Sequence, residues 1–573
     1  MLKGDFTQNM RLVFLVYLGG CALCAATLMV LSLLGVSDRI VGIAFVLLTV
    51  AFYACMGLLS RTAGASGPSD YLVAGRHVPA LYNGMATAAD WMSAATFLGV
   101  AGIIFAQGYD GLAYVVGWTG GYVLVAVLVA PFLRKSGSVT IPDFLAERYG
   151  GSTARRVGAA ILISVSFTYV VAQLYAIGII AARFLDIDFS SAVFVGLAGI
   201  LLCALVGGMR TLIWTQVAQY LVVIFAFLLP LVLLSARDTG VPLPHLMFGR
   251  ALEQAATVSH DLVADGLPWT RLHHPANFLA IIVSLTLGTA SLPHVLSRFL
   301  TTPSVRAARL SAAWSLLFLL VLYSLIPAYA AFAKLESLRH VAPLTADWAD
   351  AWIRLDLLSI SHGPDGSVLL HLAPDAVVLA TPEIAGLPFV VAALVAAGAL
   401  AAALSSADGL LLSIGKAVAL DLAGPGTATP ARRMTALRIT MLIAGGLAAG
   451  LASLRPAGIV TLVASAFSLA GSGLFPALVL GVWWKRTTKA GAILGMLAGW
   501  LTAVLYIVLV QSRLMPPVLG IEAEGAGLFG IPLAMMVTVL VSLTTPAPGE
   551  RMDRFIESIR IPRGPVRPVD DGA

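Results

Sequence analysis

Apolar segments of about 20 residues recur along the whole chain, and they limit its fold more than any other feature. A helix of this length spans the hydrocarbon core of a bilayer, whereas the strands of a membrane barrel would appear as alternating segments of about 10 residues. No soluble domain of 573 residues has 59% hydrophobic and 11% charged residues. The sequence therefore predicts an all-α, polytopic membrane protein surrounded by the lipid bilayer. The short basic loops form no basic domain, so nucleic acid is excluded as a partner.

About fourteen transmembrane helices are predicted, and their connections alternate in charge. If the N-terminus lies inside, 25 of the 35 Lys and Arg residues fall in the loops of one side and 10 in those of the other. The positive-inside rule makes the richer side cytoplasmic. Both termini are therefore expected in the cytoplasm and the chain in a bacterial-type inner membrane. The expected spans are 12–35, 40–60, 82–107, 111–133, 157–182, 189–207, 212–236, 276–297, 310–332, 386–414, 437–454, 457–482, 490–511 and 525–545.

The spans suggest a division into peripheral helices and a core. Two peripheral helices occupy 1–60, a core with its following helix 61–511, a further peripheral helix 512–545 and a cytoplasmic tail 546–573. Within the core, two groups of five spans cover about 82–236 and 276–482, and they enter the membrane from opposite sides. The long outer loop 333–385 fits either a short hairpin or helix that caps the outer mouth, or a solvated loop. On the inner side, 140–149 is predicted to form a short helix capped by Thr140, with Pro142 in its first turn.

The span 82–107 carries polar residues that a plain membrane helix would avoid. An ionised carboxylate such as that of Asp90 costs roughly 2.5–3.5 kcal/mol at the bilayer centre on insertion scales, and Ser93 and Thr96 follow within two turns. Non-helical backbone at that depth occurs only where it is buried in protein or lines a wet passage. We interpret this stretch as a broken helix at a midplane site. The alternative is an acid that pairs inside the bundle.

A second interruption, 287–294, occupies the corresponding place in the other group of five spans. Gly288 tolerates unusual dihedral angles and Pro293 lacks a backbone donor, so the helix is expected to break here, although a kink would fit too. Interrupted spans at matching positions of two halves indicate a transporter site.

The stretch 397–408 places two adjacent hydroxyls, Ser405 and Ser406, among small residues that let helices approach closely. Hydroxyl and carbonyl oxygens suit a hard monovalent cation, as in ion filters. The same serines can equally bond back to carbonyls of their own helix. Spacing alone leaves both readings open. The four cysteines, including the Cys21-x-x-Cys24 pair, lie in apolar spans without metal-binding companions and are read as apolar residues.

Eight motifs in register carry a family resemblance across about 40–500. They are SDYLVAGRHVP (69–79), ATAADWMSAATFLG (86–99), GYDGLAY (108–114), TIPDFLAERYG (140–150), GGMRTLIWTQ (207–216), GTASLPHVLSRF (288–299), AAALSSADGLLL (401–412) and FPALVLGVWWKRTTKAGAILG (475–495). The chain resembles the sodium:solute symporter family, and within it the acetate permeases and related monocarboxylate symporters. The resemblance implies a five-plus-five inverted-repeat (LeuT-like) core. It also implies a sodium ion (Na+) held by the carbonyls of Ala89, Met92 and Ala402 and the hydroxyls of Ser405 and Ser406.

The expected function is symport, in which Na+ entry drives uptake of a small organic anion, a monocarboxylate such as acetate, by alternating access; the chain is not expected to be an enzyme. Residues assigned to the substrate are Asp90, Trp91, Ser93, Thr96, Gly288, Thr289, Ala290, Tyr169 and Gln173. Asp90 is also the candidate for handling a second cation, and the aromatic residues fit core packing equally well. Alternatives are proton coupling, another solute such as proline, pyruvate or a sugar, a sensor module, a channel and an intramembrane enzyme. The sequence does not indicate the oligomeric state.

Overall fold

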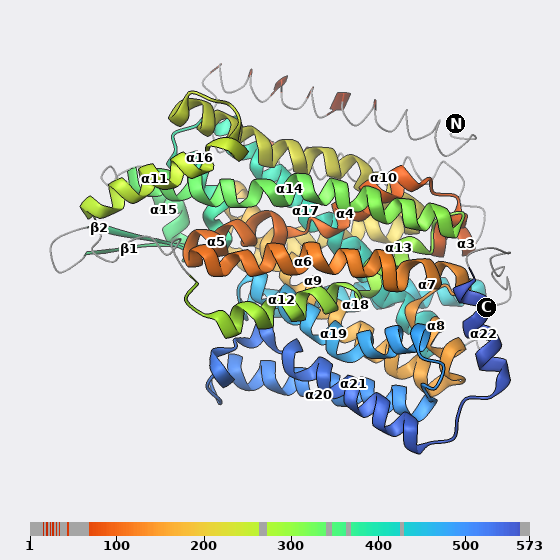
Figure 1. Ribbon diagram of the computed structural model, residues 1–573. Coiled ribbons are helices and arrows are strands. Elements are labelled where there is room, and N and C mark those ends of the chain that lie inside the picture. The colour runs from red at the N-terminus through yellow and green to blue at the C-terminus, as the bar shows by residue number, and fades with distance from the viewer. Residues whose placement is uncertain are drawn as a thin grey trace.

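The computed structural model describes residues 68–262, 272–339, 347–362, 368–424 and 429–561, with isolated positions between Leu15 and Leu48. The expected spans 12–35 and 40–60 and the end of the tail lie outside these continuous ranges. The described chain is almost entirely helical, and long helices run side by side through the molecule (Figure 1).

Within the described ranges, twelve α-helices precede α15 and the hairpin. They are α3 (Pro68–Val73), α4 (Ala80–Trp91), α5 (Val100–Gln107), α6 (Leu112–Leu124), α7 (Ala130–Ser136), α8 (Ile141–Tyr149), α9 (Ser152–Leu185), α10 (Phe189–Thr239), α11 (Pro244–Leu262), α12 (Pro275–Thr289), α13 (Pro293–Phe299) and α14 (Val305–Arg339).

The second half begins with α15 (Asp347–Arg354) and an antiparallel hairpin of β1 (Leu358–His362) and β2 (Val368–Leu372), in which Ile360 pairs with Leu370. The remaining helices are α16 (Val377–Ile384), α17 (Phe389–Lys416), α18 (Pro430–Ser453), α19 (Ile459–Trp483), α20 (Lys489–Gln511), α21 (Gly527–Thr544) and α22 (Glu550–Arg560).

Nine helices of the described ranges are long and apolar enough to cross a membrane, or ten if the bent pair α12–α13 is one span. The expected spans between 82 and 545 each overlap one of these helices, a half of the kinked α10, or a pair of shorter helices. The total of fourteen and the inverted five-plus-five repeat remain predictions.

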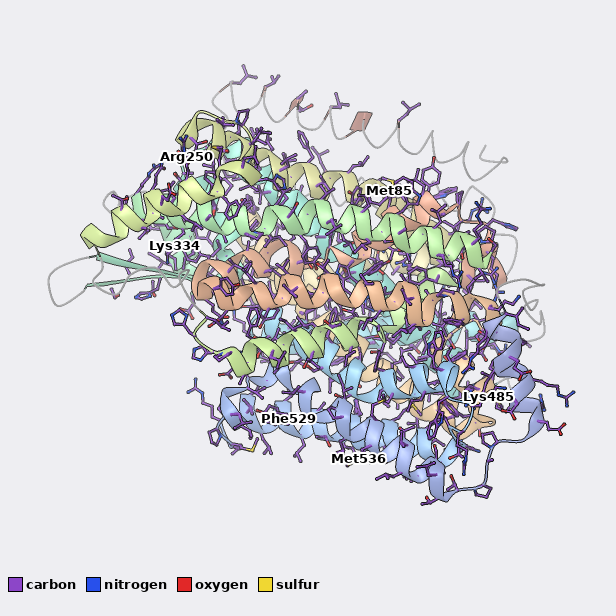
Figure 2. The ribbon with its side chains drawn as sticks, viewed as in Figure 1. Met85, Arg250, Lys334, Lys485, Phe529 and Met536 are labelled. Carbon is purple, nitrogen blue, oxygen red and sulfur yellow. The ribbon has the colours of Figure 1, made fainter. Side chains whose placement is uncertain are left out.

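The two ends of the bundle differ in the way that the loop charges predict. The helices α11, α15 and α16 and the hairpin gather at one end, and α8 and α22 lie at the other (Figure 1). Lys334 and Arg250, from the expected outer loops, lie toward the first end, and Lys485, from an expected inner loop, lies toward the second (Figure 2). We call these the outer and inner ends after the loops expected there; the side of the membrane that each end faces stays a prediction.

The core of the bundle is formed by α17 and α19. Within their apolar stretches, 83% and 94% of the residues are buried, against 33% for α18. Small residues explain how closely α17 approaches its neighbours: a Cβ added at Gly398 would lie 2.4 Å from the Cβ of Ala226 on α10. The serine-bearing helix is therefore central, with α9 and α10 packed against it.

Two helices break where the sequence predicts interruptions. α4 ends at Trp91, Met92 and Ser93 leave the helical path, and the chain resumes at Ala94 with a π-helical turn. α12 ends at Thr289, and α13 starts at Pro293 with a bend of 42° between them. Single π turns inside helices are frequent at functional sites.

The expected inner helix is present as α8. The hydroxyl of Thr140 accepts a hydrogen bond from the Asp143 amide at 3.1 Å, and a proline occupies the first turn. The same hydroxyl donates to Asp421, beyond the end of α17, at 2.8 Å. The cap thereby ties α8 to the inner end of the central helix.

A segment that we call the outer cap, residues 373–388, closes over the outer end of the bundle and includes α16. The Tyr329 hydroxyl donates to the Val378 carbonyl at 3.0 Å, and Glu383 accepts from Arg183 at 2.8 Å and from Trp352 at 2.8 Å. Residues 376–382 are almost completely buried. Both expected elements, a hairpin and a helix, occur in 333–385, so the solvated-loop alternative is wrong for the outer cap.

The carboxylate of Asp375 in the outer cap accepts from the first amide of α19, that of Ile459, at 3.1 Å. Burial raises the pKa of Asp375 to about 6, from 3.8, although the Ile459 bond opposes that shift. Because the folded state holds the proton more tightly, stability should fall as pH rises from 4 to 6. Asp375→Asn keeps an acceptor without a charge, so at pH 7.5 it should gain up to about 3 kcal/mol over the wild type.

The test is thermal unfolding of the purified wild type and Asp375→Asn at pH 4.5 and pH 7.5. The difference in Tm between them should be large at pH 7.5 and nearly vanish at pH 4.5. An equal difference at both pH values would show that the carboxyl does not titrate in this range.

Candidate functional site

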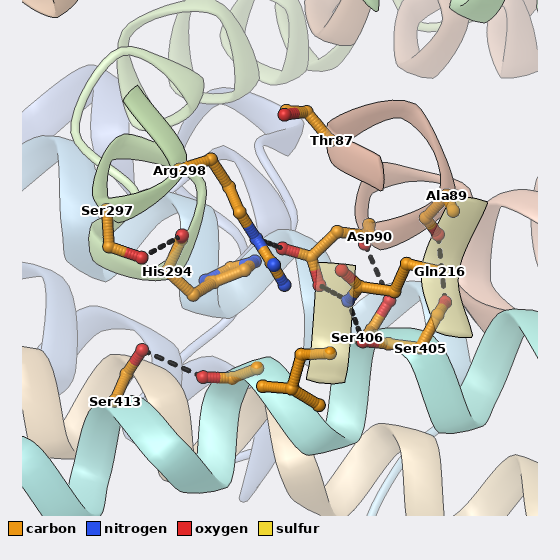
Figure 3. A network of polar contacts seen from close by, with 12 residues as sticks. Thr87, Ala89, Asp90, Gln216, His294, Ser297, Arg298, Ser405, Ser406 and Ser413 are labelled. Atoms are coloured by element: carbon orange, nitrogen blue, oxygen red, sulfur yellow. Dashed lines mark hydrogen bonds and ion pairs between the residues drawn. The ribbon is translucent and has the colours of Figure 1, made fainter. Parts of the chain in front are cut away.

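The hydroxyls of Ser405 and Ser406 face the end of α4, where that helix breaks (Figure 3). Ser405 Oγ lies 2.8 Å from the Ala89 carbonyl oxygen and 2.9 Å from that of Ala402. Ser406 Oγ lies 2.6 Å from the Asp90 carbonyl oxygen and 3.4 Å from that of Ala402. Both serines are buried, at 1% and 0% exposure. Two hydroxyls and the carbonyls of two helices therefore converge on one buried spot.

Convergence of neutral oxygens is the donor set that a partly dehydrated monovalent cation requires. The structure brings together Ala89, Ala402, Ser405 and Ser406, four of the five residues that the resemblance implied. None of the hydrogen bonds that the two hydroxyls make within the described ranges goes to the Met92 carbonyl; Asp90 supplies the third carbonyl. Each serine also reaches back to Ala402 on its own helix, which is the second reading; the cation site stays a prediction.

Asp90 directs its side chain away from the serines into a buried ion pair. Its Oδ2 accepts from Nε of Arg298 on α13 at 3.2 Å, and its Oδ1 accepts from the Gln216 amide on α10 at 3.3 Å. The same Gln216 amide donates to the Ser405 carbonyl at 2.7 Å. Asp90 and Arg298 are 0% and 1% exposed. Removing one partner of such a buried pair typically costs about 3–5 kcal/mol.

This pairing changes the role expected for Asp90. Both oxygens of Asp90 accept from protein donors, and Arg298 already supplies the positive charge that a second cation would bring. The alternative weighed from sequence, an acid that pairs inside the bundle, describes its side chain. Its backbone carbonyl nevertheless contributes to the serine site.

The other residues at the first break form a small polar network. Trp91 Nε1 donates to the Tyr323 hydroxyl at 3.1 Å, and the Thr96 hydroxyl lies 3.2 Å from the same oxygen. Gln173 Oε1 accepts from the Ala94 amide at 3.0 Å, which is the first amide beyond the break. Gln173 thus satisfies a backbone donor that the interruption of the helix leaves without a partner.

Gln173→Leu should therefore destabilise the broken conformation. The substitution removes the acceptor of a buried amide, and an unsatisfied buried donor costs about 1–3 kcal/mol. We expect a Tm several degrees lower and weaker solute binding, measured by thermal unfolding with and without solute. Gln173→Glu, studied at a pH low enough to keep its carboxyl neutral, retains the acceptor oxygen and serves as the matched control for Tm; it lacks the Nε2 donor, so it does not serve for solute binding. A Gln173→Leu protein as stable as the wild type would contradict this role.

Aromatic rings pack around the same break. The Phe467 ring on α19 lies 5.6 Å from that of Trp91, 5.5 Å from Trp118 and 6.0 Å from Tyr169. Tyr122 lies 5.7 Å from Trp91. Tyr169 also faces Ser93 and stacks edge-on against His294. Trp91 and Tyr169, assigned to the substrate from sequence, therefore belong to one aromatic cluster.

Several buried side-chain polar groups near the two breaks have no partner among the described residues. They include Trp118 Nε1, Gln173 Nε2, Ser93 Oγ and Thr289 Oγ1, and each of these side chains is at most 1% exposed. Buried polar groups are normally hydrogen-bonded, so these groups are available to a bound solute.

The residues at the second break lie against neighbouring backbone. A Cβ added at Gly288 would lie 2.3 Å from the Phe467 carbonyl oxygen, and one at Gly121 would lie 2.4 Å from the Thr289 Cβ. Thr289 and Ala290 are 0% exposed, and Gly288 is buried. Gly288 therefore serves close packing of α12 against α19, while Thr289 alone of the three offers a free polar atom.

The roles of Gln216, Arg298, Tyr323, Trp118 and Phe467 were missed in the sequence. Gln216 ends one of the quoted motifs, GGMRTLIWTQ, and Arg298 is the second-last residue of another, GTASLPHVLSRF, so a signal for them existed. The three aromatic residues lie in apolar spans, where nothing local distinguishes them from lipid-facing or core residues.

Comparisons with known proteins show the family of this chain. A model of the sodium:solute symporter family matches residues 71–355 and 365–499. An uncharacterized symporter from Cupriavidus necator is 39% identical, over 91% of this chain and 93% of its own length. A monocarboxylic acid transporter from Corynebacterium glutamicum is 30% identical, over 78% of this chain and 79% of its own length.

One solved structure, a substrate-bound outward-open Na+-coupled sialic acid symporter, covers 89% of this chain and 99% of its own with a TM-score of 0.67 at 16% identity. That likeness concerns the fold. The family match and the relatives confirm the resemblance drawn from the motifs. The chain belongs to the sodium:solute symporter family and is a multi-pass membrane symporter.

Proposed function

We propose that this protein couples the entry of Na+ to the uptake of a small monocarboxylate, such as acetate, across a bacterial inner membrane with both termini in the cytoplasm. The observation that carries the proposal is the convergence of Ser405 and Ser406 on the carbonyl end of the broken α4. Na+ would be held there by the Ala89 and Ala402 carbonyls and the two hydroxyls. The Met92 carbonyl would join them if the broken turn shifts on ion binding.

Sodium binding at this spot favours one arrangement of α4 against α17, because its ligands come from both helices. The energy of the ion gradient is thereby linked to the geometry of the break in α4, where the solute would bind. This is how a secondary transporter makes access to a midplane site alternate between the two sides. The protein supplies positions and electrostatics, and no covalent step occurs.

A carboxylate is the solute class that the break favours. The unpartnered groups of Trp118 and Gln173 can only donate and the hydroxyl of Thr289 can donate, and a carboxylate consists of acceptors. The amino ends of the half-helices after both breaks add partial positive charge. The rings of Trp91 and Phe467 offer apolar contact to a short alkyl chain. The monocarboxylic acid transporter among the relatives supports the same class.

Proteoliposome uptake tests the proposal. Purified protein is given labelled acetate, propionate, pyruvate, proline and glucose under an imposed Na+ or H+ gradient. We expect accumulation of a short monocarboxylate driven by Na+, with stimulation by unlabelled solute on the opposite side. Proton-driven uptake alone would reject the sodium site, preference for proline or glucose would reject the solute class, and absence of counterflow would favour a sensor or a channel.

A further inference from the structure

Asp90 is the point at which three helices and the serine site meet. Its carbonyl accepts from Ser406 on α17, its Oδ1 from Gln216 on α10, and its Oδ2 from Arg298 on α13 (Figure 3). α13 is the segment that follows the second break, so the Asp90–Arg298 pair joins the first broken helix to the second. The link lies directly beside the proposed sodium ligands.

The guanidinium of Arg298 lies against α17 at a position without a side chain. A Cβ added at Gly409 of α17 would lie 3.1 Å from Arg298 Nη2 and 3.1 Å from Asp90 Oδ1, so the absence of a side chain lets the guanidinium lie against the central helix. Met209 Sδ accepts from Arg298 Nη1 at 3.8 Å. Arg298 is 1% exposed and carries a permanent charge. Asp408 also faces this pair, but Asp90 is the acid that Arg298 contacts.

We infer that Arg298 is the fixed counter-ion of Asp90 and takes the place of a second coupling cation. This inference rests on the proposed sodium–carboxylate symport. A carboxylate beside the sodium ligands would otherwise attract another cation from solution on each cycle. With Arg298 tethered to α13, the positive charge stays in the protein. One Na+ then moves with one carboxylate, and no net charge crosses the membrane.

The consequence is a transporter that does not use the membrane potential. Each positive charge carried inward would change the accumulation ratio about 50-fold per 100 mV. Wild-type accumulation should therefore change less than about 2-fold when a potential of 100 mV is imposed, since no net charge moves. In Arg298→Gln, Asp90 loses its counter-ion and a mobile Na+ or H+ replaces it. Accumulation should then rise tens-fold with an inside-negative potential.

The experiment compares proteoliposomes of the wild type, Arg298→Gln, Arg298→Lys and the double variant Asp90→Asn/Arg298→Gln, with and without a potassium diffusion potential set by valinomycin. Arg298→Lys retains the charge and should stay independent of voltage. The double variant has no charge to balance and should also be independent of voltage. Arg183→Gln, which removes an arginine from a different ion pair in the outer cap, controls for loss of any such pair.

The outcomes separate the two proposals. If the wild type shows no sodium-driven uptake, the proposed function is rejected before any variant is compared. Wild-type uptake that is sodium-driven but strongly voltage-dependent overturns the proposed role of Arg298 and leaves the proposed function intact. An active Arg298→Gln whose uptake stays voltage-independent has the same consequence. If Arg298→Gln is inactive, the double variant decides: recovered voltage-independent uptake supports the counter-ion, and equal inactivity overturns it.

Discussion

Replacing both hydroxyls, in Ser405→Ala/Ser406→Ala, is expected to remove the sodium dependence of uptake. The substitution deletes two of the oxygens that converge on the proposed ion site and leaves the carbonyls of Ala89 and Ala402. Each hydrogen-bond-like contact to a charged species is worth about 1.5–3 kcal/mol. Loss of two such contacts should weaken the apparent affinity for Na+ by about 100-fold or more, since about 1.4 kcal/mol is a factor of ten.

The measurement is the sodium concentration that gives half-maximal uptake, together with the Na+-induced increase in Tm of the purified protein. Ser413→Ala is the matched control. Ser413 is on the same helix, two turns toward the inner end, and its hydroxyl bonds to the Gly409 carbonyl of that helix at 2.8 Å. Unchanged sodium dependence in Ser405→Ala/Ser406→Ala would show that the ion binds elsewhere.

Gly102→Ala should stop the outer cap from closing. A Cβ at Gly102 on α5 would lie 1.9 Å from the Pro374 carbonyl oxygen and 2.5 Å from its carbonyl carbon. These are backbone atoms, which cannot rotate away as a flexible side chain would. The cap must lift or α5 must move, at a cost of about 1–3 kcal/mol or more. Uptake should fall at least about 10-fold, because that energy opposes one conformation of the cycle.

Accessibility of the cap distinguishes this effect from unfolding. Val378 on α16 is 0% exposed, so a Val378→Cys probe in a background without the four native cysteines reports the closed cap. Gly102→Ala should raise its labelling rate from the outside. The control is Gly120→Ala on α6. A Cβ at Gly120 would meet only the Thr286 hydroxyl, at an ordinary contact distance of 3.7 Å. A normal labelling rate and normal uptake in Gly102→Ala would show that the close contact between Gly102 and Pro374 does not hold the cap in place.

Much of the fold could be predicted because a membrane helix can be recognised from its own residues. A run of apolar residues spans the bilayer whatever its neighbours are, and polar residues inside such a run, as at Asp90 and Ser93, are expensive enough to mark a break. The paired serines and the glycine–proline pair at 288 and 293 are equally local signals. The order of the spans, both interruptions and the capped inner helix at 140–149 followed from these signals.

The partners of these residues could not be predicted in the same way. Asp90 and Arg298 are 208 positions apart, and Asp90 and Gln216 are 126 apart. The residues between them do not indicate which helices become neighbours. The sequence left Asp90 available to a cation, and its pairing with Arg298 gives it a structural use instead. Phe467 and Trp118 likewise became part of the site only because α6 and α19 meet at the break.

By itself, the sequence determined that this chain crosses a membrane many times, that two of its helices are interrupted, and that hydroxyls lie in a central helix of small residues. The tertiary structure decided which oxygens meet and which charge faces which. The physical reason is the separation along the chain of the groups involved. The free-energy cost of burying a polar group depends on that residue and its depth, whereas the hydrogen bond or ion pair that offsets this cost needs an atom supplied by another helix.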